Sequence, residues 1–293
     1  MFEIPGVTIT AKIAEGACAE IYTGMERGTG KVLALKILHQ RHRSNKTEFK
    51  RLLAEGELVM RFGQQENLVQ GVRTGNADGL PYLIMEYVRG KTLREIIVER
   101  KKLSELDILR ITKALGRALC ALHALNYAHK DMKPDNVIVS HEGVIKLLDF
   151  GFAEKFNSFK LFGRSLDGSL PYLAPEMFST KRGTASTDVY ALGCTLYECA
   201  TGIQPFGGMS DIEIVTRQKD LGYTPPPIRQ ANPGISPLTE KMILKAIEKD
   251  VTKRFQTAAE LLLDLKRNPA FRDTPENSRL SMLPAKPSQT ANI

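Results

Sequence analysis

The sequence predicts an α+β protein of two lobes, a small, mainly antiparallel β lobe followed by a larger, mainly helical lobe. Its 293 residues allow one large domain or two lobes that share a cleft. Strand-like runs separated by turn residues extend to about residue 88, and helical periodicity dominates the chain from there to about residue 268. Hydrophobic residues make up 42% and charged residues 25%, which excludes a wholly disordered or fibrous chain.

The first lobe, about residues 8–88, is predicted to contain a meander of strands and one helix. Extended segments at 7–14, 19–25 and 31–38 are connected in part by the turn 27–30. A polar, basic helix is expected at about 46–62. Two further strand-like runs, 67–74 and 80–88, flank the turn 76–79.

The second lobe, about residues 91–268, begins with a clear helix signal. Ser104 and Asp107 resemble a capping box, and apolar residues recur at steps of three and four from Ile108 to Leu122. Two short strands are expected at 136–140 and 144–150, and further helices near 186–201, 239–248 and 257–267. Residues 269–293 are polar and contain several prolines, so we expect a disordered C-terminal tail.

Charge and cysteine content narrow the class of protein. The net charge of +8 is spread over short basic runs without interleaved aromatic residues, which favours a solvated face and no nucleic-acid partner. No apolar run is long enough to span a membrane, and the N-terminus does not resemble a signal peptide. Reduced thiols in the cytoplasm fit best, because no CxxC pair or zinc spacing occurs among Cys18, Cys120, Cys194 and Cys199.

The segment 129–136 carries an acid, a base and an amide directly before a predicted strand. Asp131 can orient a hydroxyl nucleophile and accept its proton, Lys133 can offset charge on a transferring phosphoryl group, and Asn136 can bind a metal ion. Asp149 follows the next strand, in an Asp-Phe-Gly turn, and offers a second oxygen ligand. This pattern suits phosphoryl transfer with Mg²⁺.

These motifs resemble those of the eukaryotic-type (Hanks-type) serine/threonine protein kinases, and the single compact domain looks most like the bacterial members. The family is marked by an HRDLKxxN loop, a DFG turn, an APE triplet, here at 174–176, and a lysine on its third strand, here Lys36. The resemblance covers about residues 8–268 and implies the bilobal protein-kinase-like fold with one key helix in its small lobe. It also implies ATP with Mg²⁺, or Mn²⁺, as cofactors.

The resemblance assigns further roles. Lys36 would hold the α- and β-phosphates of ATP and pair with a helical glutamate, for which Glu55 fits best and Glu57 is the alternative. Lys133 resembles the lysine of the serine/threonine branch of the family. Arg254 is similar to the arginine that pairs with the glutamate of the APE triplet, here Glu176. His129 would support the catalytic loop.

The adenine site follows from the same resemblance. Met85 would be the gatekeeper, and the backbone of Glu86 and Val88 would face the adenine edge. The apolar residues above and below the base would be Ile13, Ile21, Ala34 and Ile138.

The sequence departs from the family at two places. Of three glycines expected in the phosphate-covering loop only Gly16 remains, with Ala14 and Ala19 at the others, which predicts weaker ATP binding or slower turnover. Lys130 replaces the arginine before the catalytic aspartate, and a lysine grips a phosphate less well. We therefore expect activity without phosphorylation of the activation segment, whose candidate sites are Ser158, Ser165 and Ser169.

The function predicted best is transfer of the γ-phosphoryl group of ATP to serine or threonine hydroxyls of protein substrates, with autophosphorylation as a further expectation. The missing glycines motivate one alternative, a pseudokinase scaffold with weak or no transfer. A small-molecule phosphotransferase shares the HxD and Asn pattern, but the APE-like triplet, Asp188 and Arg254 favour a protein substrate.

Overall fold

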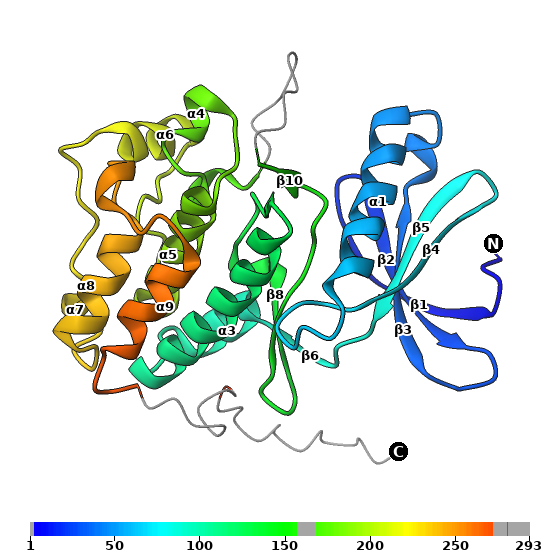
Figure 1. Cartoon of the computed structure of the whole chain (residues 1–293), viewed down its shortest axis with the longest axis horizontal. Coiled ribbons are helices and arrows are strands. Elements are labelled where there is room, and N and C mark those ends of the chain that lie inside the picture. Colours follow the sequence, from blue (N-terminus) through cyan, green and yellow to red (C-terminus); the bar gives the residue numbers. More distant parts are fainter. Residues whose placement is uncertain (1–2, 157–167, 272–279, 281–293) are drawn as a thin grey trace.

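The computed structural model describes residues 3–156, 168–271 and 280. A twisted antiparallel sheet with one helix beside it forms one lobe, and a group of helices forms the other (Figure 1). The five strands of the sheet lie in the order β1-β2-β3-β5-β4, and their bounds are β1 (Val7–Glu15), β2 (Ala19–Glu26), β3 (Val32–Leu38), β4 (Gly71–Ala77) and β5 (Leu80–Glu86). The fold is the predicted α+β class.

Strand β3 shows why the sheet has one apolar face and one cleft face. Leu33, Leu35 and Ile37 are buried on the side that packs with Tyr82 and Ile84. Side chains alternate across a strand, so Lys36 lies on the opposite side from these three. The period of two therefore places the lysine toward the cleft.

Helix α1 (Lys46–Val59) lies against this sheet. The Asn45 side chain caps it by accepting hydrogen bonds from the N–H groups of Thr47 and Glu48. Gly56 faces Thr74 of β4 so closely that a Cβ would lie 2.1 Å from the Thr74 methyl carbon. The predicted helix, 46–62, is slightly too long, because the chain tightens to a 3₁₀ turn at Met60–Phe62 and then turns at Gly63 with φ of 59°.

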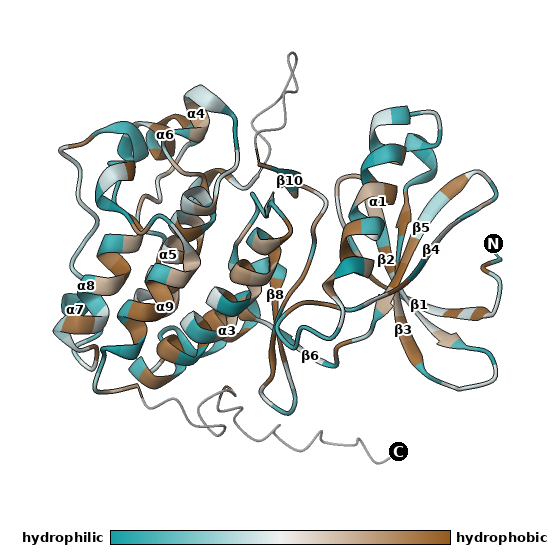
Figure 2. Cartoon of the chain, viewed as in Figure 1, coloured by the Kyte–Doolittle hydropathy of each residue, from teal (hydrophilic) through white to brown (hydrophobic). Residues whose placement is uncertain are grey.

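The larger lobe is mainly helical, with short strands beside the cleft. Its hydrophobic residues concentrate on the inner helices (Figure 2). The helices are α2 (Leu93–Arg100), α3 (Glu105–Ala124), α4 (Met177–Thr180), α5 (Ala185–Thr201), α6 (Asp211–Lys219), α7 (Ile228–Ala231), α8 (Pro237–Ala246) and α9 (Ala258–Lys266). The strands are β6 (Gly90–Thr92), β7 (Tyr127–Ala128), β8 (Val137–Ser140), β9 (Ile145–Leu147) and β10 (Glu154–Lys155). Short 3₁₀ turns of this lobe lie at Pro134–Asn136, Leu170–Tyr172 and Val251–Lys253, and one of the small lobe lies at Gln40–His42.

The strand predicted at 67–74 is wrong in its first half. Residues 67–70 do not enter the sheet, and Val69 instead donates its N–H to the carbonyl of Leu147 at 3.1 Å, while Leu147 donates to Asn67 at 2.9 Å. The Asn67 side chain also donates to the Ile145 carbonyl. Backbone groups of the small lobe are thus satisfied by β9 of the large lobe, which joins the two lobes.

In the predicted tail, residues 269–271 and 280 are described, and of these Phe271 and Leu280 are buried. Leu280 donates its N–H to the carbonyl of Gly143 at 2.8 Å. Ser278 and Ser281 lie outside the described residues. Within the described part of the chain, no helix combines the length and the apolar character that crossing a bilayer requires.

Candidate active site

A cleft of about 570 Å³ opens between the lobes. Its walls come from β1–β3, α1, the segment after β5 and the strands β8 and β9. The predicted site residues that line it are Ile13, Gly16, Ile21, Ala34, Lys36, Glu55, Met85, Glu86, Val88, Asn136, Ile138 and Asp149. Sequence reasoning missed other lining residues, among them Leu38, Glu48, Arg51, Val69 and Leu148.

Lys36 connects three elements at the back of the cleft. Its Nζ lies 2.8 Å from both carboxylate oxygens of Glu55 and 2.8 Å from Oδ1 of Asp149. Burial lowers the pKa of Lys36, but the carboxylates of Asp149 and Glu55 outweigh this and raise it above its ordinary value. The lysine is therefore charged, and Glu55 rather than Glu57 is its partner.

The turn at 149–151 is fixed by side chains from both lobes. Burial would raise the pKa of Asp149, but the Lys36 ammonium and the Gly151 N–H hold it well below its ordinary value. Phe150 is buried edge-to-face against Phe62 and His129, with ring centroids 4.6 and 5.0 Å away. The Asp149 backbone has a φ of 54°, so the turn aims its carboxylate back at the cleft.

The loop 129–136 brings its three chemical groups together. The Asn136 amide donates to the backbone carbonyl and to Oδ2 of Asp131, both at 2.8 Å. The Nζ of Lys133 lies 2.9 Å from the same Oδ2. Asp131 is buried, with 4% of its surface exposed, so these contacts hold its carboxylate in one orientation.

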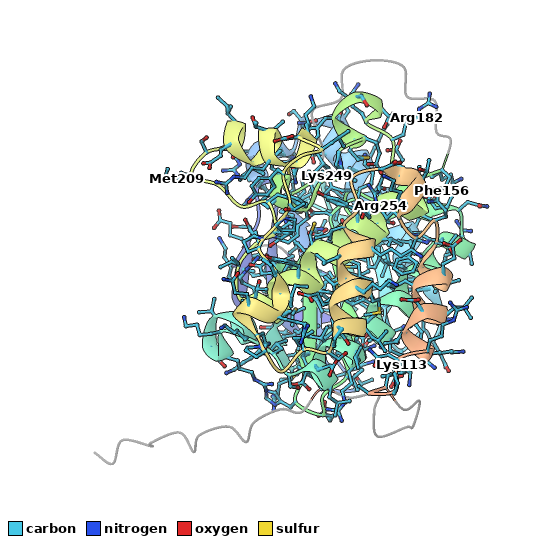
Figure 3. All side chains as sticks on the ribbon, turned by 90° about the vertical axis from the view of Figure 1, so that its left-hand side faces the viewer. Lys113, Phe156, Arg182, Met209, Lys249 and Arg254 are labelled. Carbon is cyan, nitrogen blue, oxygen red and sulfur yellow. The ribbon has the colours of Figure 1, made fainter. Side chains whose placement is uncertain are left out.

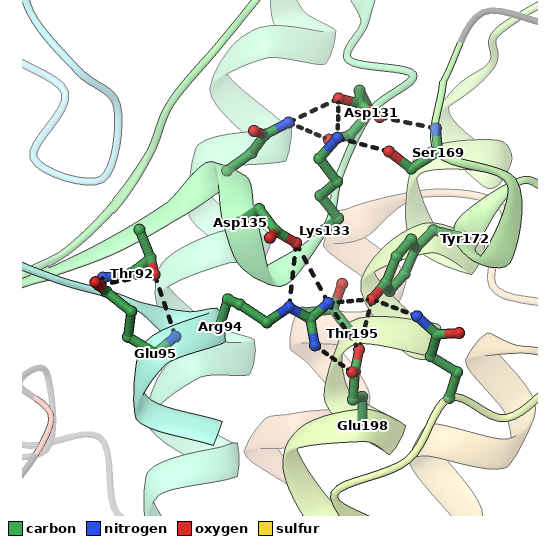
Figure 4. Close-up of polar contacts among 12 residues, drawn as sticks. Thr92, Arg94, Glu95, Asp131, Lys133, Asp135, Ser169, Tyr172, Thr195 and Glu198 are labelled. Carbon is green, nitrogen blue, oxygen red and sulfur yellow. Dashed lines mark hydrogen bonds and ion pairs between the residues drawn. The ribbon is translucent and has the colours of Figure 1, made fainter. Parts of the chain in front are cut away.

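Ser169 completes this cluster from the activation segment (Figure 4). Its backbone N–H donates to Oδ1 of Asp131 at 2.9 Å, and its Oγ accepts from the Nζ of Lys133 at 2.6 Å. A phosphate on Ser169 would face the Asp131 carboxylate, which argues against it as an activating modification site. The other two candidates, Ser158 and Ser165, lie outside the described residues.

Asp188, at the start of α5, holds the loop from below. Its carboxylate accepts hydrogen bonds from the backbone N–H groups of His129 at 2.8 Å and Lys130 at 2.9 Å. Nε2 of His123 lies 2.9 Å from Oδ2 of the same carboxylate. The sequence indicated the position of Asp188 but gave no sign of these partners. Nδ1 of His129 accepts the Asp131 N–H at 3.2 Å, so its Nε2 is the donor to the Leu148 carbonyl.

The predicted ion pair between Arg254 and Glu176 is present. The guanidinium donates to both carboxylate oxygens, at 2.7 and 3.2 Å, and Arg254 is only 2% exposed. Figure 3 shows Arg254 inside the helical lobe, whereas Met209 projects from its surface. The pair ties the APE-like triplet to the chain before α9.

A second network, which the sequence did not reveal, lies beside the loop (Figure 4). Arg94 of α2 donates to Asp135 at 3.2 Å, to the Tyr172 hydroxyl at 2.6 Å and to Glu198 of α5. The Tyr172 hydroxyl in turn donates to Glu198 at 2.6 Å, and burial raises the pKa of this tyrosine. One guanidinium thus links the loop 129–136, the segment before the APE-like triplet and α5.

The loop between β1 and β2 adopts a backbone that does not require its missing glycines. None of residues 14–19 has a positive φ. Ala14 pairs with Ile21 in the ladder, and Ala19 lies in β2 opposite Leu38. Burial raises the pKa of the Cys18 thiol, so this cysteine is a poor candidate for redox chemistry.

Side-chain oxygen atoms of Asn136 and Asp149, which both line the cleft, suit a divalent cation. Both N–H bonds of the Asn136 amide are used by Asp131, which leaves its carbonyl oxygen as the ligand atom. Lys36 and Gly151 bind Oδ1 of Asp149, and the ionised carboxylate has a second oxygen. A carboxylate and an amide oxygen suit Mg²⁺, which takes its other ligands from water and substrate phosphates.

Comparison with known proteins decides the family. The sequence model for the protein kinase domain matches residues 7–264. The chain belongs to the protein kinase family.

Bacterial serine/threonine-protein kinases are among the relatives of this chain. The kinase domain is 33% identical over 256 residues to a probable serine/threonine-protein kinase of Clostridium perfringens, a match that covers 87% of this chain and 37% of that protein. It is 32% identical over 255 residues to the serine/threonine-protein kinase PrkC of Bacillus subtilis, covering 87% of this chain and 39% of PrkC. The chain therefore spans well under half the length of these relatives.

Proposed function

We propose that this kinase domain transfers the γ-phosphoryl group of ATP to serine or threonine hydroxyls of proteins. The observation that carries the proposal is the Lys36 ammonium, bound at once to Glu55 and Asp149 at 2.8 Å on the wall of the interlobe cleft. This arrangement leaves a charged lysine beside the space for phosphates, with a cation-binding carboxylate next to it. The names of the bacterial relatives support serine and threonine as acceptors.

In this proposal the cleft residues position the nucleotide. The adenine ring lies between Ile13, Ile21 and Ala34 above and Ile138 below, with Met85 behind it and the backbone of Glu86 and Val88 at its edge. Gly16 and its neighbours cover the phosphates, and Lys36 holds the α- and β-phosphates.

The loop residues then handle the acceptor. Asp131 orients the hydroxyl and accepts its proton, while Lys133 offsets negative charge on the transferring group. Asn136 and Asp149 would hold Mg²⁺, or Mn²⁺, which neutralises phosphate charge when bound. The bond from the γ-phosphorus to the β,γ-bridging oxygen breaks as the bond to the acceptor oxygen forms, and ADP leaves.

The test is transfer of label from γ-labelled ATP to the chain itself and to a generic protein substrate, followed by phosphoamino-acid analysis. We expect phosphoserine or phosphothreonine from the wild type and none from Asp131→Asn or Lys36→Met. Lys31→Met, an exposed lysine just before the same strand, is the matched control and should keep full activity. A wild type as inactive as the variants at saturating ATP would favour the scaffold alternative.

We further propose that activity does not require phosphorylation of the activation segment. Lys130 pairs with Glu154 of β10, with 3.0 Å between Nζ and the carboxylate, and both side chains are buried. Strand β10 pairs with β7 next to the catalytic loop, so an internal carboxylate supplies the anion that anchors the start of this segment. Phosphatase-treated protein should retain at least half of its transfer rate; complete loss would contradict the proposal.

The proposal also includes protein substrates with serine or threonine acceptors, autophosphorylation and a cytoplasmic location. Four free cysteines, two of them buried, fit a reducing compartment. The labelling experiment tests autophosphorylation directly, because the chain is its own first acceptor there.

A further inference from the structure

The tip of the phosphate-covering loop is bound by three donors from one neighbouring segment. Gly16 O lies 2.8 Å from Nε2 of His39, Cys18 O accepts the backbone N–H of His39 at 2.9 Å, and Ala17 O accepts from Arg41 at 2.7 Å. His39 follows β3 directly, and Arg41 lies in the 3₁₀ turn Gln40–His42. Three consecutive carbonyls thus contact the connection between β3 and α1.

His39 is suited to this contact by its burial and its neighbours. Only 6% of its surface is exposed, although it is a polar residue directly after Leu38, which lines the cleft. A carbonyl oxygen can only accept, so Nε2 carries the proton in this contact. The carboxylates of Glu15 and Glu20 lie 3.9 Å from the ring nitrogens, and both also bind Lys12. The ring is therefore enclosed by groups of the same hairpin.

We propose that His39 and Arg41 are positioning residues that hold the phosphate-covering loop in its nucleotide-binding position. This inference rests on the proposed function. In kinases with three glycines the loop backbone is free to adjust, whereas here alanines replace two of them and an external clamp fixes the tip. We call the His39 and Arg41 side chains the clamp. With the clamp in place, the loop is already ordered before ATP binds and does not have to adjust when it binds.

The energetic consequence is in nucleotide affinity. An unclamped loop would have to lose backbone freedom when ATP binds. The observed affinity is then the intrinsic affinity multiplied by the fraction of molecules whose loop is already in its binding position. One hydrogen bond contributes about 0.5–1.5 kcal/mol, which corresponds to about a 2- to 12-fold change in an equilibrium constant. The bond of the buried His39 should therefore lie in the upper half of this range, and that of the exposed Arg41 in the lower half.

The test measures the dissociation constant and off-rate of a fluorescent ATP analogue with Mg²⁺, and the KM and kcat for ATP, on purified protein. We expect His39→Asn to raise the dissociation constant and KM about fivefold, with kcat changed less than twofold. His39→Gln should stay within twofold of the wild type, because its amide nitrogen reaches the place of Nε2, whereas the asparagine amide is one bond shorter. Arg41→Ala should raise both constants about twofold.

Arg43→Ala is the matched control, since Arg43 lies beside the β4–β5 turn at Gly79 rather than the loop. Equal affinity in His39→Asn, His39→Gln and the wild type, at equal melting temperatures, would overturn the proposal, as would an Arg43→Ala effect as large as that of Arg41→Ala. Binding is measured without transfer, so a protein that binds nucleotide but transfers nothing would refute the proposed function and still test the clamp.

Discussion

Ser169 lies between the two groups that the proposed transfer uses, Asp131 and Lys133. Its hydroxyl is the only side-chain group it offers, so Ser169→Ala removes the bond to Lys133 and leaves the backbone bond to Asp131. A hydrogen bond to a charged group contributes about 1.5–3 kcal/mol, so we expect kcat to fall about 10- to 100-fold with KM for ATP nearly unchanged. Steady-state kinetics measure both.

Ser169→Thr keeps the hydroxyl and should retain most of the activity, which makes it the control for Ser169→Ala. Ser169→Asp places a second carboxylate beside Asp131 and should abolish transfer. An active Ser169→Asp variant would show that the contact seen here does not persist during turnover.

Arg254 gives a prediction for stability. Its guanidinium is 2% exposed and pairs with Glu176, so Arg254→Ala leaves a carboxylate without its partner in a largely buried place. We expect the free energy of unfolding to fall by about 3–5 kcal/mol in a denaturant titration. Lys253→Ala, at the adjacent position where the lysine side chain is itself 70% exposed, should change the free energy of unfolding by less than about 0.5 kcal/mol. A loss below about 1 kcal/mol for Arg254→Ala would mean that the buried pair contributes little.

Residues within a sequence motif could be predicted, and residues that meet from distant elements could not. Lys36, Asp131, Asn136 and Asp149 lie in short motifs whose order along the chain identifies them. Ser169 gains its role from partners at least 36 positions away, and Arg94 from partners at least 41 positions away. The side chain of His39 contacts Gly16, 23 positions away. No local spacing encodes such pairs, because they depend on how the elements pack.

At the scale of elements, the approach of α1 to the sheet decides whether Glu55 reaches Lys36. A Cβ at Gly56 would lie 2.1 Å from the Thr74 methyl carbon, so Gly56→Ala should push the helix outward, lower the free energy of unfolding by about 1–3 kcal/mol and reduce transfer. Thr74→Ser removes that methyl group. In this background Gly56→Ala should instead stabilise by up to about 1 kcal/mol, because alanine favours a helix over glycine.

This change of sign is measured by denaturant titration of the four proteins in the double-mutant cycle. Leu83 lies at an ordinary contact distance of 3.6 Å from the added carbon, so the threonine is the only close neighbour among the described residues. Destabilisation of equal size in both backgrounds would place the steric conflict elsewhere.

Helices with long apolar periodicity could be predicted, and short ones could not. α3, α5, α8 and α9 lie near the predicted ranges, whereas α2 and α6 were not predicted. Both begin with a threonine or serine followed three positions later by glutamate, Thr92 with Glu95 and Ser210 with Glu213. This cap signal was present, but eight or nine residues hold too few apolar positions for the period to show.

At the scale of the whole molecule, one hydrophobic core extends through both lobes, beside a smaller cluster on the sheet that includes Leu35 and Ile84. A continuous set of buried apolar residues runs from Leu52 of α1 through Phe150 to α5 and α9. The change from strand-like to helical periodicity predicted two lobes, but the segment 67–69 that pairs with β9 could not be foreseen, since its sequence also suits a strand of the sheet. A shared core predicts that the lobes unfold together rather than one after the other.

Nucleotide binding should therefore stabilise the entire domain and not just the small lobe. The cleft is lined by both lobes, so ATP with Mg²⁺ at about 100 times its dissociation constant should add about 2.7 kcal/mol and raise a single melting transition by about 5–10 °C. Asp149→Asn should lose the Mg²⁺-dependent part of this shift, because the amide offers one ligand oxygen and no charge. Scanning calorimetry distinguishes joint from independent unfolding of the lobes. Two resolved transitions, with only one shifted by nucleotide, would show that the lobes unfold independently despite the core they share.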